Sequence, residues 1–258
     1  MKSAVSRGVV AVSTVAVLGL TAACSGGGSG GDGDGAGKGE KPGRADSAST
    51  PASTPASASA KLEKAALASG DLKKYKVEPG PGEAKDKARP SARRVNPAEC
   101  RPLAEMLTAA APATSKAHVS RTLTSTDVAD TTTTEVVLLA YGQADSEKTM
   151  DTLRVATKAK KCATFGDGGR RYFGVRPQPG PVDGDEAVSY KLASRTGEFL
   201  HRDRVTVVRS GSTLIAFRAS NIFDPTSARS DEDGDPKVAD AIVEAQLAKL
   251  AGAKQKQK

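Results

Sequence analysis

The sequence predicts an α+β fold in which helices pack on one face of a mostly antiparallel sheet. Runs rich in β-branched residues recur along the chain, and helical patterns stand in separate groups instead of alternating strictly with the strands. A short link around Gly211 joins two such runs and predicts a β-hairpin. Because the chain has no tryptophan and only 3% aromatic residues, we expect a core of valine, leucine, isoleucine and alanine.

The strand predictions come from alternating or β-branched segments. The run from Val136 to Ala140 is apolar without interruption, which is typical of a buried strand. The expected strands cover residues 72–77, 117–125, 131–141, 171–175, 187–192, 198–208 and 213–219.

Helical spacing of apolar residues predicts the helices. A short helix over 61–69 ends at Gly70, and Asn96-Pro97 has the cap and first residue of a second helix that reaches Leu107. Either Asp145 or Ser146 is expected to cap a third helix that ends near Cys162. Asp235-Pro236 is expected to start the last helix, which runs to Leu250.

The first residues have the pattern of a bacterial lipoprotein signal. Lys2 and Arg7 precede an apolar run over 9–20, whose length of about 18 Å as a helix is well short of a bilayer core of about 30 Å. The stretch Leu20-Thr21-Ala22-Ala23-Cys24 resembles a lipobox, so we expect cleavage before Cys24 and diacylglycerol on its sulfur. The alternative is an ordinary secretory signal with a free cysteine nearby.

Composition then divides the chain into four parts. Residues 1–23 are the expected signal peptide, and 24–60 are the lipidated cysteine followed by a disordered tether rich in glycine, serine and proline. Residues 61–253 form the expected α+β domain, and 254–258 form a basic tail. This organisation predicts a protein held on the extracytoplasmic face of the cell membrane by acyl chains such as palmitate.

The remaining cysteines, Cys100 and Cys162, form an even pair in an exported domain. Such a pair outside the cytosol predicts a disulfide, which would join the helix near Cys100 to the end of the helix before Cys162. A catalytic cysteine or a metal site would need partner ligands that the sequence does not supply. We therefore expect no metal and no cofactor.

No catalytic constellation emerges from the histidines. His118 and His201 both lie in expected strands, and a hydrolase triad with His201 and Asp203 lacks a Gly-x-Ser-x-Gly nucleophile motif. The nearest serine pattern, Ser210-Gly211-Ser212, is interpreted as a hairpin turn. The sequence thus predicts a protein that is not an enzyme.

The acidic stretch 231–235 is rich in the oxygen ligands of a calcium-binding loop, but the residues that follow it do not fit such a loop. An EF-hand loop needs glycine at its sixth position and glutamate at its twelfth, where this chain has Pro236 and Ile242. We interpret the stretch as a solvated loop whose last aspartate caps the following helix.

The formal net charge of +8 allows two interpretations. Positive charge attracts anionic envelope polymers or lipid headgroups, and it also keeps a domain soluble. Nucleic acid is not an expected partner, because the basic residues lack interleaved aromatic ones and the compartment is outside the cell.

Several short motifs resemble one known family. They are Pro97-Ala-Glu-Cys100 with Pro102-Leu103, Cys162-Ala-Thr-Phe165, Gly184-Asp-Glu-Ala-Val188, and a hairpin around Arg209 and Gly211, followed by a terminal alanine-rich helix. Over residues 62–251 this order resembles the extracellular sensor domain of actinobacterial PknH-like serine/threonine kinases and of lipoproteins that carry the same module. The resemblance implies an antiparallel sheet flanked by helices around a ligand-binding cleft.

The resemblance has limits in this chain. It maps Cys100–Cys162 onto one of the family's disulfides, while a second cysteine pair found in some members is absent from the sequence. No kinase portion is present and no catalytic residue carries over.

Two functional hypotheses follow. The first is a membrane-tethered, non-enzymatic module that binds or senses a small molecule or a wall polymer in the cell envelope, at residues not yet identified. The alternative is a structural or accessory envelope protein that binds a partner protein without a small-molecule ligand.

Overall fold

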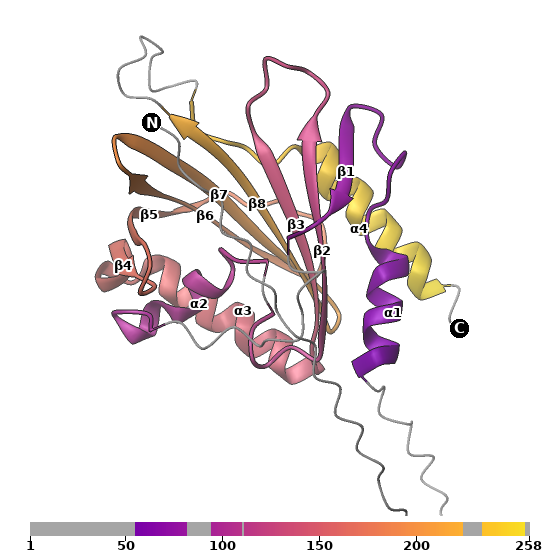
Figure 1. Cartoon of the computed structure of the whole chain (residues 1–258). Helices are drawn as coiled ribbons and strands as arrows, with labels where there is room; N and C mark the ends of the chain where they lie inside the picture. The colour runs from indigo at the N-terminus through magenta and orange to yellow at the C-terminus, as the bar shows by residue number, and fades with distance from the viewer. Residues whose placement is uncertain (1–54, 82–93, 110, 224–233, 256–258) are drawn as a thin grey trace, which may run out of the picture. The chain divides into compact units, whose positions relative to one another are not determined.

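An eight-stranded antiparallel sheet forms the centre of the structure, a computed structural model that describes residues 55–81, 94–109, 111–223 and 234–255 (Figure 1). The strand order is β1-β2-β3-β8-β7-β6-β5-β4. The strands are β1 (Tyr75–Pro79), β2 (Ala117–Ser125), β3 (Thr133–Ala140), β4 (Thr164–Gly166), β5 (Arg171–Gln178), β6 (Glu186–Thr196), β7 (Phe199–Ser210) and β8 (Thr213–Phe223).

The helices are α1 (Pro55–Ala65), α2 (Arg101–Glu105), α3 (Gln143–Lys158) and α4 (Asp240–Gln255), with short 3-10 helices η1 (Ala98–Cys100) and η2 (Lys160–Ala163). After β3 the chain passes through α3 to the far edge strand β4 and then returns strand by strand to β8. The pairing of β3 with β8 therefore joins the two halves of the sheet, with Val137 directly opposite Ala216. The α+β prediction is confirmed.

Helices cover both faces of the sheet, so the prediction of one covered face was wrong. Figure 1 shows α2 and α3 on one side of the strands and α1 and α4 on the other. Side chains alternate across a strand, so Val137 enters the core under α2 and α3 while Val136 enters the core under α1 and α4. Because β3 and β8 are apolar on both faces, each face needs its own helical cover.

The core under α2 and α3 is the larger of the two. Its fully buried members include Leu103, Met150, Leu153, Tyr190 and Phe165. Cys100 and Cys162 lie in the same core with no exposed surface and are joined by a disulfide, with their Cα atoms 5.5 Å apart.

The opposite core fixes the end of α1. Gln246 of α4 is fully buried; its side-chain oxygen accepts from Leu67 N at 3.1 Å, and its nitrogen donates to Ala65 O at 2.7 Å. From β2, Arg121 Nε donates to Leu67 O at 2.9 Å and its guanidinium pairs with Glu63. Backbone groups left open at a helix end are thus bonded by side chains from two other elements.

The folded unit begins earlier than the sequence predicted. Helix α1 starts at Pro55, six residues before the expected boundary at Lys61, and Ala58 packs into the core with Leu62. Proline suits a first helical position, where its missing N–H has no partner to lose. Residues 55–60 of the expected tether are therefore helical, and Lys254 of the expected basic tail lies in α4.

Three other predicted element ends differ from the structure. Asn96 forms a β-bridge with Gly166, and the helix after it is limited to η1 and α2. Helix α3 begins at Gln143, where Ser146 Oγ donates to Gln143 O at 2.7 Å. Helix α4 begins at Asp240, beyond the expected start at Asp235.

No helix in the described ranges combines the length and the apolar character needed to cross a membrane. The expected signal peptide, Cys24 and residues 25–54 lie outside the described residues.

Candidate functional site

A cleft with a volume of about 970 Å³ opens on the face that carries α2 and α3. Its floor is the end of the sheet that extends past the helical cover, and its walls are two loops. The described lining residues are Pro81, Arg94, Leu107, Thr108, Ala109, Glu135, Asp167, Gly168, Gly169, Arg170, Tyr172 and Arg218. We call this hollow the cleft.

The floor forms where two central strands change from apolar to charged side chains. On this face Glu135 stands two residues before Val137, and Arg218 stands two residues after Ala216. Glu135 and Arg218 are direct cross-strand partners, and Arg218 Nη2 lies 2.6 Å from Glu135 Oε2. This opposite-charge pair stabilises the register of the strands at the mouth of the core.

Arg218 also connects the floor to one wall. Its Nη1 donates to the carbonyl oxygen of Leu107, in the segment that follows α2. Its Nε is buried and has no hydrogen-bond partner within the described part of the chain. Arg218 therefore has unused donor capacity beside the cleft.

The second wall is the turn between β4 and β5. Asp167 is buried, and its Oδ1 accepts from the backbone N–H groups of Gly169 at 3.0 Å and Arg170 at 2.7 Å. Gly168 has a φ of +85°, a conformation that glycine adopts without steric cost. The hydroxyl of Tyr172 donates to Asp167 Oδ2 at 3.5 Å.

Burial keeps the phenols near the cleft protonated. It raises the pKa of Tyr172, and the negative charge of Asp167 raises it further. Burial also raises the pKa of Tyr190 well above its usual range, and the Tyr190 hydroxyl donates to Leu103 O at 3.1 Å. At neutral pH both side chains are neutral, and each hydroxyl proton is donated within the fold, that of Tyr172 to Asp167 and that of Tyr190 to Leu103.

The disulfide positions both walls. Cys100 ends η1 and leads through α2 to Leu107–Ala109, while Cys162 lies in η2 and leads through β4 to the turn at Asp167. Phe165 of β4 stacks on Tyr172 with ring centroids 5.0 Å apart, which extends this rigid connection into the cleft.

The residues considered for hydrolase chemistry are not brought together. His118 lies on β2 and His201 on β7, and strands β3 and β8 lie between them in the sheet. The Asp203 carboxylate accepts from Ser220 Oγ at 2.6 Å. Ser210 and Ser212 flank Gly211, whose φ of +60° makes the β7–β8 turn that the sequence predicted.

Of the acidic stretch, residues 231–233 lie outside the described residues. Asp235 does not cap a helix as expected, because α4 begins later; its Oδ2 pairs with Lys191 Nζ at 2.6 Å. Within the described ranges, no group of three or more histidine, cysteine, aspartate or glutamate side chains is placed to hold a metal ion.

The cleft residues were not identified from the sequence. Glu135 and Arg218 each interrupt an apolar strand pattern on a core-facing position, and that interruption is the signal that could have found them. Asp167 and Tyr172 gave a weaker signal, because polar residues beside a glycine-rich turn are common.

Two solved structures are similar to this chain. The extracellular domain of PknH from Mycobacterium tuberculosis has 8% sequence identity and a TM-score of 0.43, with 76% of this chain and 96% of that chain covered. An uncharacterised protein from Mycobacterium smegmatis has 13% identity and a TM-score of 0.35, with 76% and 93% covered. No family model matches the sequence, and no curated protein matches it. At these identities and TM-scores, neither structure assigns a function to the chain.

Proposed function

We propose that this protein is a lipid-anchored, extracytoplasmic lipoprotein whose folded unit is a non-enzymatic, sensor-like ligand-binding module. The cleft carries this proposal. Its volume of about 970 Å³ lies at the upper end of the ~300–1,000 Å³ that small-molecule sites usually have. Its walls are held by a disulfide and its floor by an ion pair, so the site exists before a ligand arrives.

The side chains of the cleft favour binding over catalysis. Among its described lining residues none is histidine, cysteine or serine. The carboxylates are already engaged, Asp167 by its turn and Glu135 by Arg218. Groups held in this way fix geometry and are poor proton carriers for a substrate.

The same lining indicates the character of the ligand. Arg94 and Arg170 are exposed at the walls, Arg218 has an unpartnered Nε, and Tyr172 supplies an aromatic ring. These groups suit a polar molecule rich in hydrogen-bond acceptors, such as a fragment of a cell-wall polymer.

A titration with soluble muropeptides tests this proposal. We expect saturable binding to protein made from the full-length chain, and we expect the double variant Arg94→Gln/Arg170→Gln to weaken it about tenfold or more. Arg171→Gln is the matched control, because Arg171 is exposed beside Arg170 but does not line the cleft. Isothermal titration calorimetry measures both variants.

If muropeptides and other wall fragments give no heat and no thermal shift, while cross-linking in cells captures a specific protein, the cleft proposal fails. That result would favour the alternative function, an accessory envelope protein that acts through a partner protein.

Anchoring has a separate test. Changing Cys24 to serine removes the sulfur that would carry the diacylglycerol, so we expect the protein to move from the membrane fraction to the medium. Two acyl chains anchor stably at about 0.8 kcal/mol per buried methylene, so the redistribution should be nearly complete. Immunoblots of membrane and medium fractions measure it, with Cys24 unchanged as the reference. A Cys24→Ser protein that stays in the membrane fraction would contradict the anchor.

A further inference from the structure

Three neighbouring strands place a row of positive charges on the sheet face opposite the cleft. Arg176 of β5 is the direct cross-strand partner of Lys191 of β6, and Lys191 is the direct partner of Arg204 of β7. Adjacent strands lie about 4.8 Å apart, so these three cations fall within about 10 Å of one another. Like charges directly opposite one another destabilise a sheet. This row of cations therefore lowers the stability of the fold unless a bound anion offsets the repulsion.

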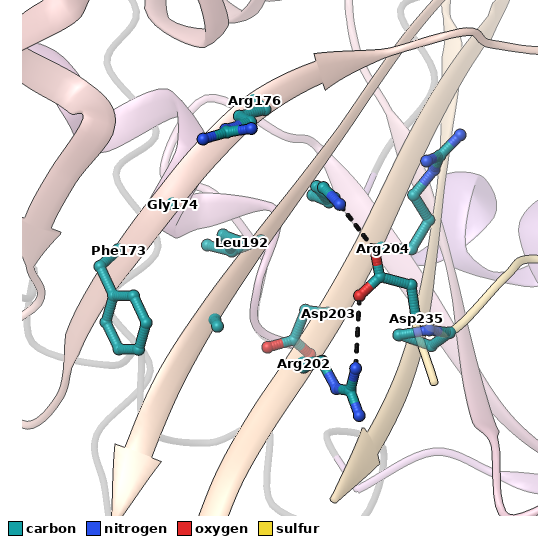
Figure 2. A pocket seen from close by; sticks show the side chains of 11 residues that line it. Phe173, Gly174, Arg176, Leu192, Arg202, Asp203, Arg204 and Asp235 are labelled. Atoms are coloured by element: carbon teal, nitrogen blue, oxygen red, sulfur yellow. Dashed lines mark hydrogen bonds and ion pairs between the residues drawn. The ribbon is translucent and has the colours of Figure 1, made fainter. Parts of the chain in front are cut away.

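The row lines a hollow of about 230 Å³, here called the basic pocket (Figure 2). Arg202, two residues from Arg204 on β7, adds a fourth cation, and Asp235 is the carboxylate directed to this face, because Asp203 alternates with the two arginines and points to the other face. The side chains directed to this face thus carry a surplus of positive charge. Phe173 and Pro236 supply apolar surface beside them.

The Asp235 carboxylate only partly neutralises these cations. It pairs with Lys191 at 2.6 Å and with Arg202 Nη1 at 3.7 Å. Figure 2 shows Asp235 directed toward Arg202, with the ion pair drawn between them. Arg202 is also stacked over Phe223, with its Cζ atom 4.3 Å from the ring centroid.

Arg204 is held by neutral groups. Its Nε donates to Ser189 Oγ at 3.1 Å, its Nη1 to Gln178 Oε1 at 2.6 Å, and its Nη2 to the Pro179 carbonyl at 3.1 Å. None of these acceptors carries a charge, and burial lowers the pKa of this guanidinium. The side chain is therefore oriented in advance while its charge has no carboxylate bonded to it within the described residues.

Arg202 also has hydrogen-bonding capacity that is not satisfied, and it is more deeply buried than Arg204. Its side chain is 9% exposed, and its buried Nε has no hydrogen-bond partner among the residues that the structure describes. A buried donor without an acceptor costs about 1–3 kcal/mol. An oxyanion in the pocket would supply acceptors to the guanidinium and remove that cost.

We propose that the basic pocket binds a phosphate group, separately from any ligand of the cleft. A phosphate monoester carries a charge of about −1.5 to −2 at neutral pH and has three acceptor oxygens, which match the surplus charge and the donors of Arg176, Lys191, Arg202 and Arg204. The volume leaves room beyond the phosphate, so the apolar side chains contact the molecule that bears it.

The first test titrates protein from the full-length chain with inorganic phosphate and with glycerol 3-phosphate in a calorimeter at low ionic strength. We expect saturable binding at one site. Arg176→Gln should weaken it about tenfold, the usual effect of losing one charge-assisted hydrogen bond. Arg176 is exposed and no ion pair to a described residue is seen for it, so this change leaves the fold intact. Arg171→Gln, on the same strand and outside the pocket, is the matched control.

A second variant separates a specific site from general attraction. Asp235→Asn removes a carboxylate that competes for Lys191 and Arg202, so phosphate should bind several-fold more tightly. Vesicles with and without phosphatidic acid form the last arm. Binding to phosphatidic acid vesicles that weakens in Arg176→Gln would identify a lipid headgroup as the source of the phosphate, and binding to the soluble compounds alone would identify a soluble source.

The proposal is overturned if neither the soluble phosphates nor the vesicles bind. It is also overturned if Arg171→Gln weakens binding as much as Arg176→Gln, because general surface charge would then explain the attraction. Weaker binding by Asp235→Asn would likewise show that the carboxylate is part of the site and does not compete with an anion.

Discussion

Replacing both core cysteines, as Cys100→Ala/Cys162→Ala, is expected to lower the free energy of unfolding by about 4 kcal/mol. The bridge joins residues 62 positions apart, and in the chain-entropy model a loop of this size restricts the unfolded chain by that amount. A loss of this size is a large fraction of the roughly 5–15 kcal/mol by which a folded domain is usually stabilised. Urea unfolding followed by circular dichroism measures it.

Reduction provides the control for this experiment. A reductant should lower the stability of the unchanged protein to about that of the double variant, and it should leave the double variant unaffected. A double variant within about 1 kcal/mol of the unchanged protein would contradict the expected role of the bridge.

The substitution Gln246→Met is expected to cost about 2–4 kcal/mol. Methionine fills a similar volume but leaves Leu67 N and Ala65 O without their partners in a fully buried site. Each buried group without a hydrogen bond costs about 1–3 kcal/mol. Thermal and urea unfolding measure the loss.

The matched control for this change is Gln255→Met, near the end of the same helix and exposed to solvent. A surface change of this kind should stay within about 0.5 kcal/mol of the unchanged protein. Equal effects of the two substitutions would show that methionine destabilises helix α4 at any position. The loss could then not be attributed to the buried hydrogen bonds of Gln246.

Strands were easier to predict than helix ends in this chain. The strand β2 matches residues 117–125 because Val119 and Leu123 alternate with the β-branched residues Thr122 and Thr124. Helix ends depend on where backbone groups find partners. Asn96 was expected to cap a helix, but its backbone bonds to Gly166, a partner that lies far along the chain and that local pattern cannot reveal.

The second helical layer was predictable in principle. The uninterrupted run from Val136 to Ala140 indicates burial on both faces, and a sheet buried on both faces needs cover on both. The cleft and the basic pocket were harder, because each depends on strand register. Glu135 meets Arg218, and Arg176 meets Lys191, only after distant strands have paired.

The attachment of α1 has a mechanical consequence. A pull on the chain before Pro55 enters the folded unit through α1, which lies outside the sheet and is fastened by Gln246 and Arg121. The edge strand β1 follows next and leads to Pro81 at the rim of the cleft, whereas the cleft floor belongs to the inner strands β3 and β8 on the opposite face. Under tension we expect α1 to detach before the strands separate, so that the floor of the cleft keeps its arrangement after α1 has come away.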